Sequence, residues 1–529
     1  MASVIEADIC IIGGGITAAM VALRLAEDTS ASIAVVEAGG RTDPLEERFE
    51  ARQRYMDYGD TPYPGDHIPD QTARGIMSRS MVLGGQAMHW GGTTPRFTPE
   101  DFRVRSLYGV GTDWPIDYDE LEPFYQEAEE RIGVSGEQGP EELDPRSSPY
   151  PMPAIPLSWT LDRLKEWGER SGIPFWANPV AKNSVPYRGR NVCQRCDTCT
   201  ICPTGAKYTP DFSFNQLLEE GRIELHLNTL VRRLELEDAT DRIEVAQAVN
   251  LESGEEVELR ARSFVLASGY AWGPHLLLLS ANSRYPDGLA NRTGNVGRWM
   301  TGHRPVSAYV EVPMELYPGI YSRHSLISNR FRRPGPLDRY LRHDLRIWES
   351  EVGRQPRLRD DDGTLLLGDA VMADWRSRGS QGAARLRGYY DVLPSRESRL
   401  TLDSSLRNDL GDPLPRVDFV DSEASLALRQ HSEDSIRGVF SELVRAGGGR
   451  MLRSGVQDIY DHPGGGARMG DDPESSVVDR WGRTHDHENL WVVGAPTMVS
   501  GGCANGTLTF SALSLRSASE LGKEFPSTA

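Results

Sequence analysis

Four of the six cysteines in this 529-residue chain lie within ten positions of one another. The segment reads "VCQRCDTCTICP" (192–203), so the cysteines follow C-x-x-C-x-x-C-x-x-C and end at a proline. This spacing lets a tight loop turn its thiolates toward one centre, and soft thiolates select zinc or iron–sulfur clusters. The candidate metal ligands are Cys193, Cys196, Cys199 and Cys202.

Three interpretations of this cysteine-rich loop are open. The ferredoxin run C-x2-C-x2-C-x3-C-P is one residue longer in its last gap but shares the final proline, which favours an iron–sulfur cluster. Paired C-x-x-C motifs also suit structural zinc, although a longer stretch usually separates the pairs. The third interpretation is a loop without metal. Disulfides are disfavoured in a cytoplasmic chain.

The segment 7–40, "ADICIIGGGITAAMVALRLAEDTSASIAVVEAGG", predicts a nucleotide-binding unit. An apolar strand is followed by Gly13, Gly15 and Ala18 in the pattern G-x-G-x-x-A, then by a helix and a second strand. The glycines permit a tight turn and let the backbone approach a pyrophosphate at the helix N-terminus. Glu37 follows about 20 residues later, where an acid accepts hydrogen bonds from ribose hydroxyls. This acid disfavours a 2′-phosphate and leaves FAD or NAD.

Later segments decide between FAD and NAD. A second Gly-rich loop spans 78–97, and strand–turn–helix patterns span 261–280 and 488–521. Together with "GNVGRWMTGH" (294–303) and "HPGGGARMG" (462–470), these segments resemble the glucose–methanol–choline (GMC) family of FAD oxidoreductases. The resemblance implies FAD as cofactor and transfer of a hydride from an alcohol carbon to the flavin.

The resemblance also implies an α/β fold of two discontinuous domains. A Rossmann-type FAD-binding domain is expected from residues 1–100, 204–303 and 455–529. A substrate-binding domain, a sheet covered by helices, is expected from 101–203 and 304–454, and it includes the cysteine-rich loop. The substrate stays unnamed because the region that would select it matches no motif.

The residues that the resemblance implicates in catalysis are His462 and Asn505. Oxidation of an alcohol needs a base tuned near neutral pH to remove the hydroxyl proton, and histidine suits this role. His462 begins the family's "HPGGGARMG" motif, and Asn505 occupies the partner position, where it would orient the substrate hydroxyl. Outside this motif order, His462 would be interpreted as a turn residue and Asn505 as a helix cap.

The resemblance further assigns residues to FAD. His89 lies in a "MHWGG" loop similar to the loop through which some pyranose oxidases bond their flavin covalently. Met88 replaces the threonine of that loop, so we expect noncovalent FAD. Val231 is expected to meet the adenine through its backbone. The full set of expected FAD contacts is Gly13, Gly15, Thr17, Ala18, Glu37, Gly84, Gly85, His89, Trp90, Gly91, Val231, Ser268, Gly494, Ala495, Asn505 and Thr507.

The resemblance also bears on the cysteines. Several GMC sugar and polyol dehydrogenases carry a Cys-rich segment before C-P-x-G-A, as in "CPTGAKY" (202–208), and pass electrons through an iron–sulfur cluster. We therefore expect a dehydrogenase that oxidises a secondary hydroxyl of a sugar or glycoside, with a small or cytochrome partner subunit as acceptor. The alternatives are an oxidase of the same fold that makes hydrogen peroxide, and a binding or electron-transfer subunit without turnover.

The composition excludes other classes of protein. The net charge of −19 argues against a nucleic-acid partner, and no window reaches the roughly 18 apolar residues of a membrane helix. The acidic balance leaves aminoglycosides or other cationic sugars as possible substrates. The N-terminal pattern contains no secretory signal, which favours the cytoplasm. The alternative is export to the periplasm with a signal-bearing partner.

Overall fold

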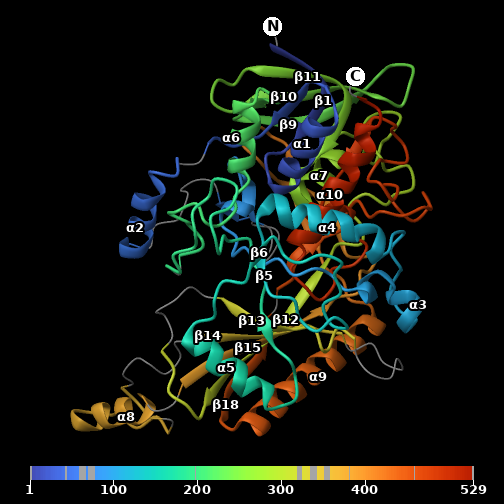
Figure 1. The fold of residues 1–529 in the computed structure, drawn as a ribbon. Coiled ribbons are helices and arrows are strands. Elements are labelled where there is room, and N and C mark those ends of the chain that lie inside the picture. Colours follow the sequence, from blue (N-terminus) through green and yellow to red (C-terminus); the bar gives the residue numbers. More distant parts are fainter. Residues whose placement is uncertain are drawn as a thin grey trace.

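The computed structural model describes most of the chain and forms two large sheets (Figure 1). In that view the first sheet lies near the two labelled termini at the top, and the second lies at the bottom. Helices pack on both sheets, so the predicted α/β class is confirmed. The described residues are 3–41, 44–58, 67–69, 78–196, 198–317, 324–333, 342–350, 358–360, 362–379, 382–457 and 459–526.

The first sheet has the strand order β8-β2-β1-β11-β10-β9, and β20 pairs with the end of β11. The strands β8, β2, β1, β11 and β20 run parallel, whereas β10 is antiparallel to both β11 and β9. The end of β1 is fully buried, as its apolar run predicts. The strands are β1 (Ser3–Ile12), β2 (Ile33–Val36), β8 (Glu224–His226), β9 (Thr229–Leu236), β10 (Ile243–Asn250), β11 (Glu256–Leu266) and β20 (Leu490–Val492).

Helices α1, α10 and α4 pack in sequence against one another beside the first sheet. The Tyr125 hydroxyl of α4 lies 2.8 Å from the Thr509 hydroxyl of α10. The predicted division put 101–203 with the second domain, but this packing favours grouping α4 with the first core. The helices of this part are α1 (Ile16–Asp28), α2 (Arg48–Tyr58), α3 (Val104–Tyr108), α4 (Tyr118–Ile132), α6 (Asp211–Glu219), α7 (Gly269–Leu279), α10 (Thr507–Gly522) and the 3-10 turns η1 (Gly85–Met88), η2 (Pro99–Phe102) and η3 (Ala495–Thr497).

The second sheet is antiparallel, with the order β18-β12-β15-β14-β13-β7 and with β19 also paired to β12. Its apolar face packs on α5 (Trp159–Glu169) and α9 (Glu423–Gly447), as Figure 1 shows. Because side chains alternate along a strand, the polar residues between these apolar ones point to the opposite face. The strands are β7 (Trp176–Ala177), β12 (Thr301–Val312), β13 (Ser325–Ser328), β14 (Leu345–Ser350), β15 (Gly382–Asp391), β18 (Arg450–Val456) and β19 (Asp461–Gly464).

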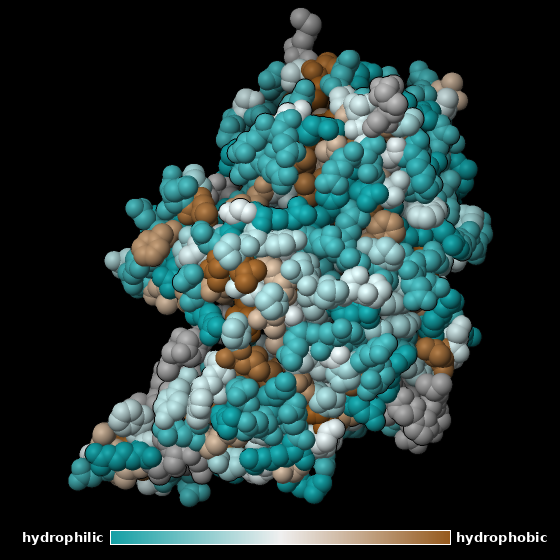
Figure 2. All heavy atoms as spheres, in the orientation of Figure 1, coloured by the Kyte–Doolittle hydropathy of each residue, from teal (hydrophilic) through white to brown (hydrophobic). Residues whose placement is uncertain are grey.

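Short elements complete the described fold. Helices α2 and α8 (Asp369–Gly379) project from the same side of the body in Figure 1, and Figure 2 shows a hollow in the largely hydrophilic surface between them. No helix in the described ranges is long and apolar enough to cross a bilayer. The remaining strands are β3 (His67–Pro69), β4 (Ser78–Ser80), β5 (Ser135–Gly136), β6 (Met152–Pro153), β16 (Arg399–Arg407) and β17 (Pro413–Asp418).

Candidate active site

The two predicted catalytic residues meet in the fold. His462 lies on β19 and Asn505 lies just before α10, and the His462 Nε2 atom is 2.7 Å from the Asn505 Nδ2 atom. His462 adopts φ +48°, a left-handed conformation that is uncommon for residues other than glycine and is enriched at functional sites. Its side chain keeps 22% of its surface exposed, so a small molecule can reach the ring.

Three neighbours of His462 were not among the predicted site residues. Because β19 pairs with β12, His303 lies opposite Asp461, and His303 Nε2 is 2.7 Å from His462 Nδ1. The Asp461 Oδ1 atom lies 3.5 Å from His462 Nδ1, and the Tyr389 hydroxyl donates to Asp461 Oδ2. His303 ends the quoted motif "GNVGRWMTGH", which is the one sequence signal that could have identified it.

These contacts select a tautomer for His462. If the Asn505 amide donates to Nε2, that nitrogen is unprotonated, and Nδ1–H donates to His303. An unprotonated Nε2 at an accessible position is the form of histidine that accepts a proton from a hydroxyl. The arrangement can therefore act as a general base.

The electrostatics of the site favour the same neutral form. Burial lowers the pKa of His462, the Asp461 carboxylate opposes this shift, and the Arg387 guanidinium adds to it. Burial also lowers the pKa of His303 well below its usual range. Burial alone would raise the pKa of Asp461, but the two histidines and the hydrogen bond from Tyr389 hold it below its usual value. At neutral pH the site thus holds a carboxylate beside two neutral imidazoles.

The first Gly-rich turn forms a cradle at the N-terminus of α1. Gly13 has φ +114°, and a Cβ atom there would lie 2.7 Å from the Ala267 carbonyl oxygen. A Cβ atom on Gly15 would meet no atom within 4 Å, so open space lies before the helix. Thr17 and Ala18 are buried in the first turn of α1, and the Thr17 hydroxyl donates to Ala267 O at 3.3 Å.

Glu37 lies at the end of β2, as predicted, but its carboxylate already has backbone partners. The Gly14 and Gly39 amides each donate to one of its oxygens at 2.7 Å. Burial raises the pKa of Glu37 to about 7, and these amides oppose the shift. A carboxylate has about four lone-pair positions, so these amides leave capacity for a ribose hydroxyl.

Strand β9 begins beside Glu37, because the Thr229 amide donates to the Glu37 carbonyl at 2.9 Å. Val231 follows on the same strand with its side chain buried in the core. Any contact of Val231 with a ligand would therefore use its backbone, which is how the sequence predicts that it meets the adenine.

Two further predicted FAD residues, Gly84 and Gly494, contact the same cradle. The Gly84 amide donates to the Gly14 carbonyl at 2.8 Å, which joins the two Gly-rich loops. A Cβ atom on Gly494 would lie 2.5 Å from Thr17 Cγ2, so the turn after β20 contacts the first turn of α1. The Gly465 amide donates to the Ala495 carbonyl at 3.0 Å, which brings the loop after His462 to this turn.

The groups around this space fit FAD. Ser268 Oγ and Asn505 Oδ1 are buried and have no hydrogen-bond partner in the part of the chain that the structure describes. Thr507 begins α10, whose N-terminus carries no side-chain cap. Uncapped helix N-termini and unpartnered polar atoms suit the phosphates and ring heteroatoms of a flavin dinucleotide.

The cysteine-rich loop contacts the His89 loop through one buried lysine. Lys207 Nζ donates to the carbonyls of Met88 at 2.8 Å, Trp90 at 3.0 Å and Cys199 at 2.7 Å. His89 lies between two of these carbonyls and is half-buried, whereas Gly91 is exposed. Lys207 thus joins a predicted FAD-binding loop to the cysteine-rich loop.

The four loop cysteines line one pocket together with Lys182 and Lys207. Burial alone would raise the pKa of the Cys202 thiol, but the Lys207 amide and ammonium hold it below its usual value. Burial raises the pKa of Cys193 and lowers the pKa of Lys207 to about 8. Across the described ranges, no group of three or more His, Cys, Asp or Glu side chains is arranged to hold a metal ion. The thiol donor set suits iron or zinc, but the metal-ligand role of the cysteines remains a prediction.

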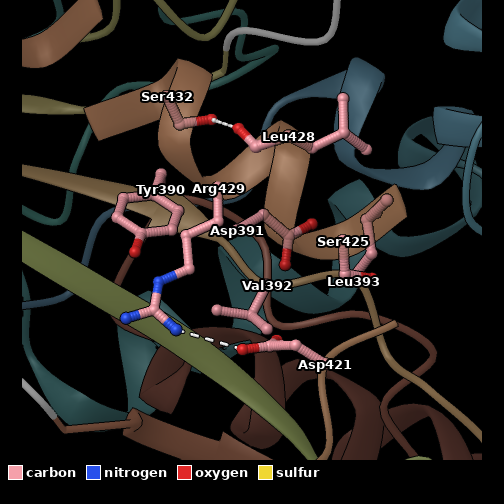
Figure 3. Close-up of a pocket in the computed structure, with 9 residues that line it drawn as sticks. All are labelled: Tyr390, Asp391, Val392, Leu393, Asp421, Ser425, Leu428, Arg429 and Ser432. Atoms are coloured by element: carbon pink, nitrogen blue, oxygen red, sulfur yellow. Dashed lines mark hydrogen bonds and ion pairs between the residues drawn. The ribbon is translucent and has the colours of Figure 1, made fainter. Parts of the chain in front are cut away.

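A separate pocket lies between α9 and the end of β15 (Figure 3). Its Arg429 is paired with Asp421 at 3.0 Å and with Glu433 at 3.2 Å. None of the predicted site residues lines this pocket, so we do not assign it a catalytic role.

Comparisons with known proteins identify the family and the fold. A sequence model described as GMC oxidoreductase matches residues 394–514. The chain is 31% identical to the fructose dehydrogenase large subunit of Gluconobacter japonicus over 97% of both chains. It is 30% identical to paromamine 6'-oxidase of Streptomyces fradiae, covering 97% of this chain and 90% of that one. The crystal structure of pyridoxine 4-oxidase from "Mesorbium loti" shares the fold, with a TM-score of 0.65 at 19% identity over 97% of this chain and 98% of that one.

Proposed function

Because the chain belongs to the GMC oxidoreductase family, we propose that it oxidises a hydroxyl of a sugar or glycoside to a carbonyl and that His462 is the base. The single observation that carries this proposal is the 2.7 Å contact between His462 Nε2 and Asn505 Nδ2. With the Asn505 amide as the donor, Nε2 is unprotonated and lies beside an amide group, which is what a substrate hydroxyl needs in order to lose its proton.

The residues have separate roles in this proposal. The substrate hydroxyl lies against His462 Nε2 and Asn505, which orients it and cannot compete as a base. His303 and Asp461 hold the ring of His462 so that Nε2 faces the substrate. The Gly13–Gly15 cradle would hold FAD, which would supply the acceptor for the hydride. His462 accepts the hydroxyl proton, and the hydride would go to the flavin.

The sugar class is supported by the relatives. One is named a fructose dehydrogenase and another a paromamine oxidase. We place the oxidation at a secondary hydroxyl, which gives a ketone.

For the fate of the electrons, we favour a dehydrogenase in which the four cysteines hold an iron–sulfur cluster that passes electrons to a partner subunit. The observation in favour is Lys207, which holds the cysteine-rich loop against the His89 loop. The alternative is an oxidase that reduces oxygen to hydrogen peroxide, and the name of the Streptomyces relative favours it.

A panel of sugars and polyols, assayed in air and anaerobically with an artificial electron acceptor, tests the reaction. We expect at least one hydroxy compound to bleach the flavin in a single anaerobic turnover. Turnover with the acceptor but little peroxide in air would support the dehydrogenase. Peroxide formation at the full rate of turnover would instead support the oxidase.

Metal analysis tests the cysteine-rich loop. We expect about three or four iron atoms per chain in anaerobically prepared protein. Cys196→Ser or Cys199→Ser should lose electron transfer to the acceptor, whereas bleaching of the flavin by substrate should survive. Cys10→Ala, a change in the core of β1, is the matched control and should retain iron. Zinc without iron would overturn the electron relay and favour the oxidase.

Acid precipitation tests how FAD is held. We expect FAD in the supernatant, because Met88 replaces the threonine of the covalent loop. Flavin that stays with the pellet would point to a covalent bond at His89.

A further inference from the structure

The face of the second sheet that turns away from α5 and α9 carries arginines close to the proposed base. Along β15, Leu386 and Tyr390 pack in the core beneath the sheet, so Arg387 and Tyr389 point to the other face. The Tyr389 ring lies 4.2 Å from the His303 ring, centroid to centroid, and its hydroxyl donates to Asp461. This face is therefore the wall of the active site.

Two aromatic rings hold Arg387 in place. Its guanidinium carbon lies 4.1 Å from the centre of the Tyr389 ring and 4.5 Å from that of Trp348, so two aromatic rings fix its orientation. Its Nε atom is buried and lacks a hydrogen-bond partner, and no ion pair of Arg387 occurs among the described residues. An unsatisfied, oriented guanidinium beside a base is costly unless a ligand completes it.

Two further arginines, Arg346 and Arg332, also have buried N–H groups without partners in the described ranges. Arg346 is fully buried, and its Nε donates to Asp344 at 2.6 Å while its Nη2 has no partner in the described ranges. Arg332 is also fully buried, and its Nε and Nη2 are likewise without partners there, although its Nη1 donates to the Arg96 carbonyl at 2.8 Å. Arg346 lies directly opposite Arg387 in the pairing of β14 with β15, and its guanidinium carbon is 5.4 Å from the centre of the same Tyr389 ring. Burial lowers the pKa of Arg346, Asp344 opposes this shift, and repulsion from Arg387 and Arg332 adds to it.

The carboxylates near this arginine cluster (Arg332, Arg346 and Arg387) are already engaged. Asp344 accepts from Arg346 and from the Tyr389 amide, at 2.6 Å each. Asp461 contacts His462 and accepts from Tyr389. Arg387, Arg346 and Arg332 nevertheless keep buried N–H groups that have no partner in the described ranges.

We infer that the arginine cluster binds an anionic group of the substrate, so that the substrate is an acidic polyol that carries a carboxylate or a phosphate. The inference rests on the proposed function, because it assigns a substrate class to the same site. A guanidinium fork matches both oxyanions in bidentate geometry. A cationic sugar, which the acidic net charge leaves possible, would be repelled by this cluster. The anionic group anchors the substrate and takes no part in the transfer of proton and hydride.

Binding to the oxidised holoenzyme is the direct test. Isothermal titration with gluconate and with sorbitol 6-phosphate, against neutral sorbitol and cationic glucosamine, compares matched polyols of different charge. We expect at least one acidic polyol to bind at least 10-fold more tightly than sorbitol, with affinity that falls as salt is added. The better of the two acids distinguishes a carboxylate from a phosphate as the recognised group.

Variants of the cluster sharpen the test. Arg387→Met should weaken binding of the acidic polyol about 10-fold to 100-fold and leave sorbitol unchanged, because a hydrogen bond between charged groups is lost. Arg453→Met is the matched control, since Arg453 also stacks on an aromatic ring of this sheet, 4.2 Å from the centre of Tyr309, but is exposed on β18. Arg387→Met should also move the acid limb of the pH profile upward, because Arg387 lowers the pKa of His462.

Each outcome decides the inference. Acidic polyols that bind no better than sorbitol to the wild-type protein would overturn it, even if the Arg387 variant fails to fold. An equal loss of affinity for acidic and neutral polyols in Arg387→Met would assign Arg387 a structural role instead. Bleaching of the flavin by neutral sugars alone would overturn this inference but leave the proposed function intact. Tight binding of acidic polyols with no bleaching by any hydroxy compound would overturn the proposed function and keep the anion site.

Discussion

At the scale of single residues, His462 depends on its neighbours for both its protonation and its direction. Burial keeps the ring neutral, His303 occupies Nδ1, and Asn505 marks the side from which a hydroxyl would approach Nε2. Asp461 opposes the effect of burial on the pKa of His462. The pKa of the proposed base therefore reflects burial together with the Asp461 and Asp344 carboxylates and the Arg387 and Arg346 guanidinium groups.

Replacement of the base tests its role most directly. His462→Ala should lower turnover by about 10² to 10⁴, the usual contribution of a positioned acid–base group. FAD should stay bound, because the cradle at Gly13–Gly15 does not involve this side chain. Asn505→Ala should cost less, since it removes orientation and not the base. Steady-state kinetics measure the turnover of both variants, and flavin absorbance shows that each variant contains FAD. Near-normal turnover of His462→Ala would show that His462 is not the base.

The pH dependence tests the neighbour of the base. Activity needs neutral His462, so kcat/KM should rise with pH through the lowered pKa of this residue and level off above it. Asp461→Asn removes the carboxylate that raises this pKa, so the acid limb should move to still lower pH. A pH–rate profile of both proteins measures the shift, and a move to higher pH would contradict the assigned electrostatics.

At the scale of elements, the turn from β1 into α1 contains two glycines, Gly13 and Gly15, with different roles. Gly13 lies at positive φ against the Ala267 carbonyl, so the fold itself requires glycine there. Gly15 meets no protein atom at its Cβ position, and its φ of −86° suits any residue. If the cradle holds a pyrophosphate, glycine is needed at this second position for the cofactor and not for the fold.

This pair of glycines gives a matched experiment. Gly13→Ala should lower the melting temperature of the protein, because the new methyl group cannot avoid the backbone of Ala267, which directly follows strand β11. Gly15→Ala should leave the melting temperature of the FAD-free protein unchanged but weaken FAD binding. Thermal unfolding and fluorescence titration with FAD measure the two effects, and full FAD affinity in Gly15→Ala would place the cofactor elsewhere.

At the scale of the whole molecule, buried histidines couple stability to pH. Burial lowers the pKa of His324 to about 3 and that of His343 to about 4. The unfolded chain protonates these residues near pH 6.5, so below that value it binds more protons than the folded protein does. The free energy of unfolding should therefore fall as the pH drops from about 6.5 toward 4.

Urea unfolding at pH 7 and pH 5 measures this loss. Each histidine should cost about 2 kcal/mol between these values, since its folded-state pKa lies at or below 4. His343→Phe loses the hydrogen bond from Nδ1 to the Asp344 carbonyl, so its stability should fall at both pH values. Its dependence on pH should nevertheless be smaller by about 2 kcal/mol. An unchanged dependence would show that His343 is not the titrating group.

The sequence by itself determined the parts of this protein that depend on local spacing. The strand, turn and helix around Gly13–Glu37 follow from neighbouring residues, since glycine torsions and apolar runs act over a few positions. The order of the motifs along the chain likewise identified the family, which supports FAD as the cofactor, and it predicted the pair His462 and Asn505. For the cysteines, the spacing indicated which residues are candidate metal ligands and which metals suit them, but it could not show how the loop folds.

Only the tertiary structure decided what surrounds the base. His303, Asp461, Tyr389 and Arg387 lie on three strands, and they meet because β12 pairs with β15 on one side and with β19 on the other. Register and face are set by pairing between distant segments, and a shift of one residue would turn Arg387 and Tyr389 into the core. Net charge sums over the whole chain and left a cationic substrate possible, whereas the local charge beside His462 depends on which side chains the sheet gathers there. That is why the composition could not indicate the anionic substrate that we infer from the arginine cluster.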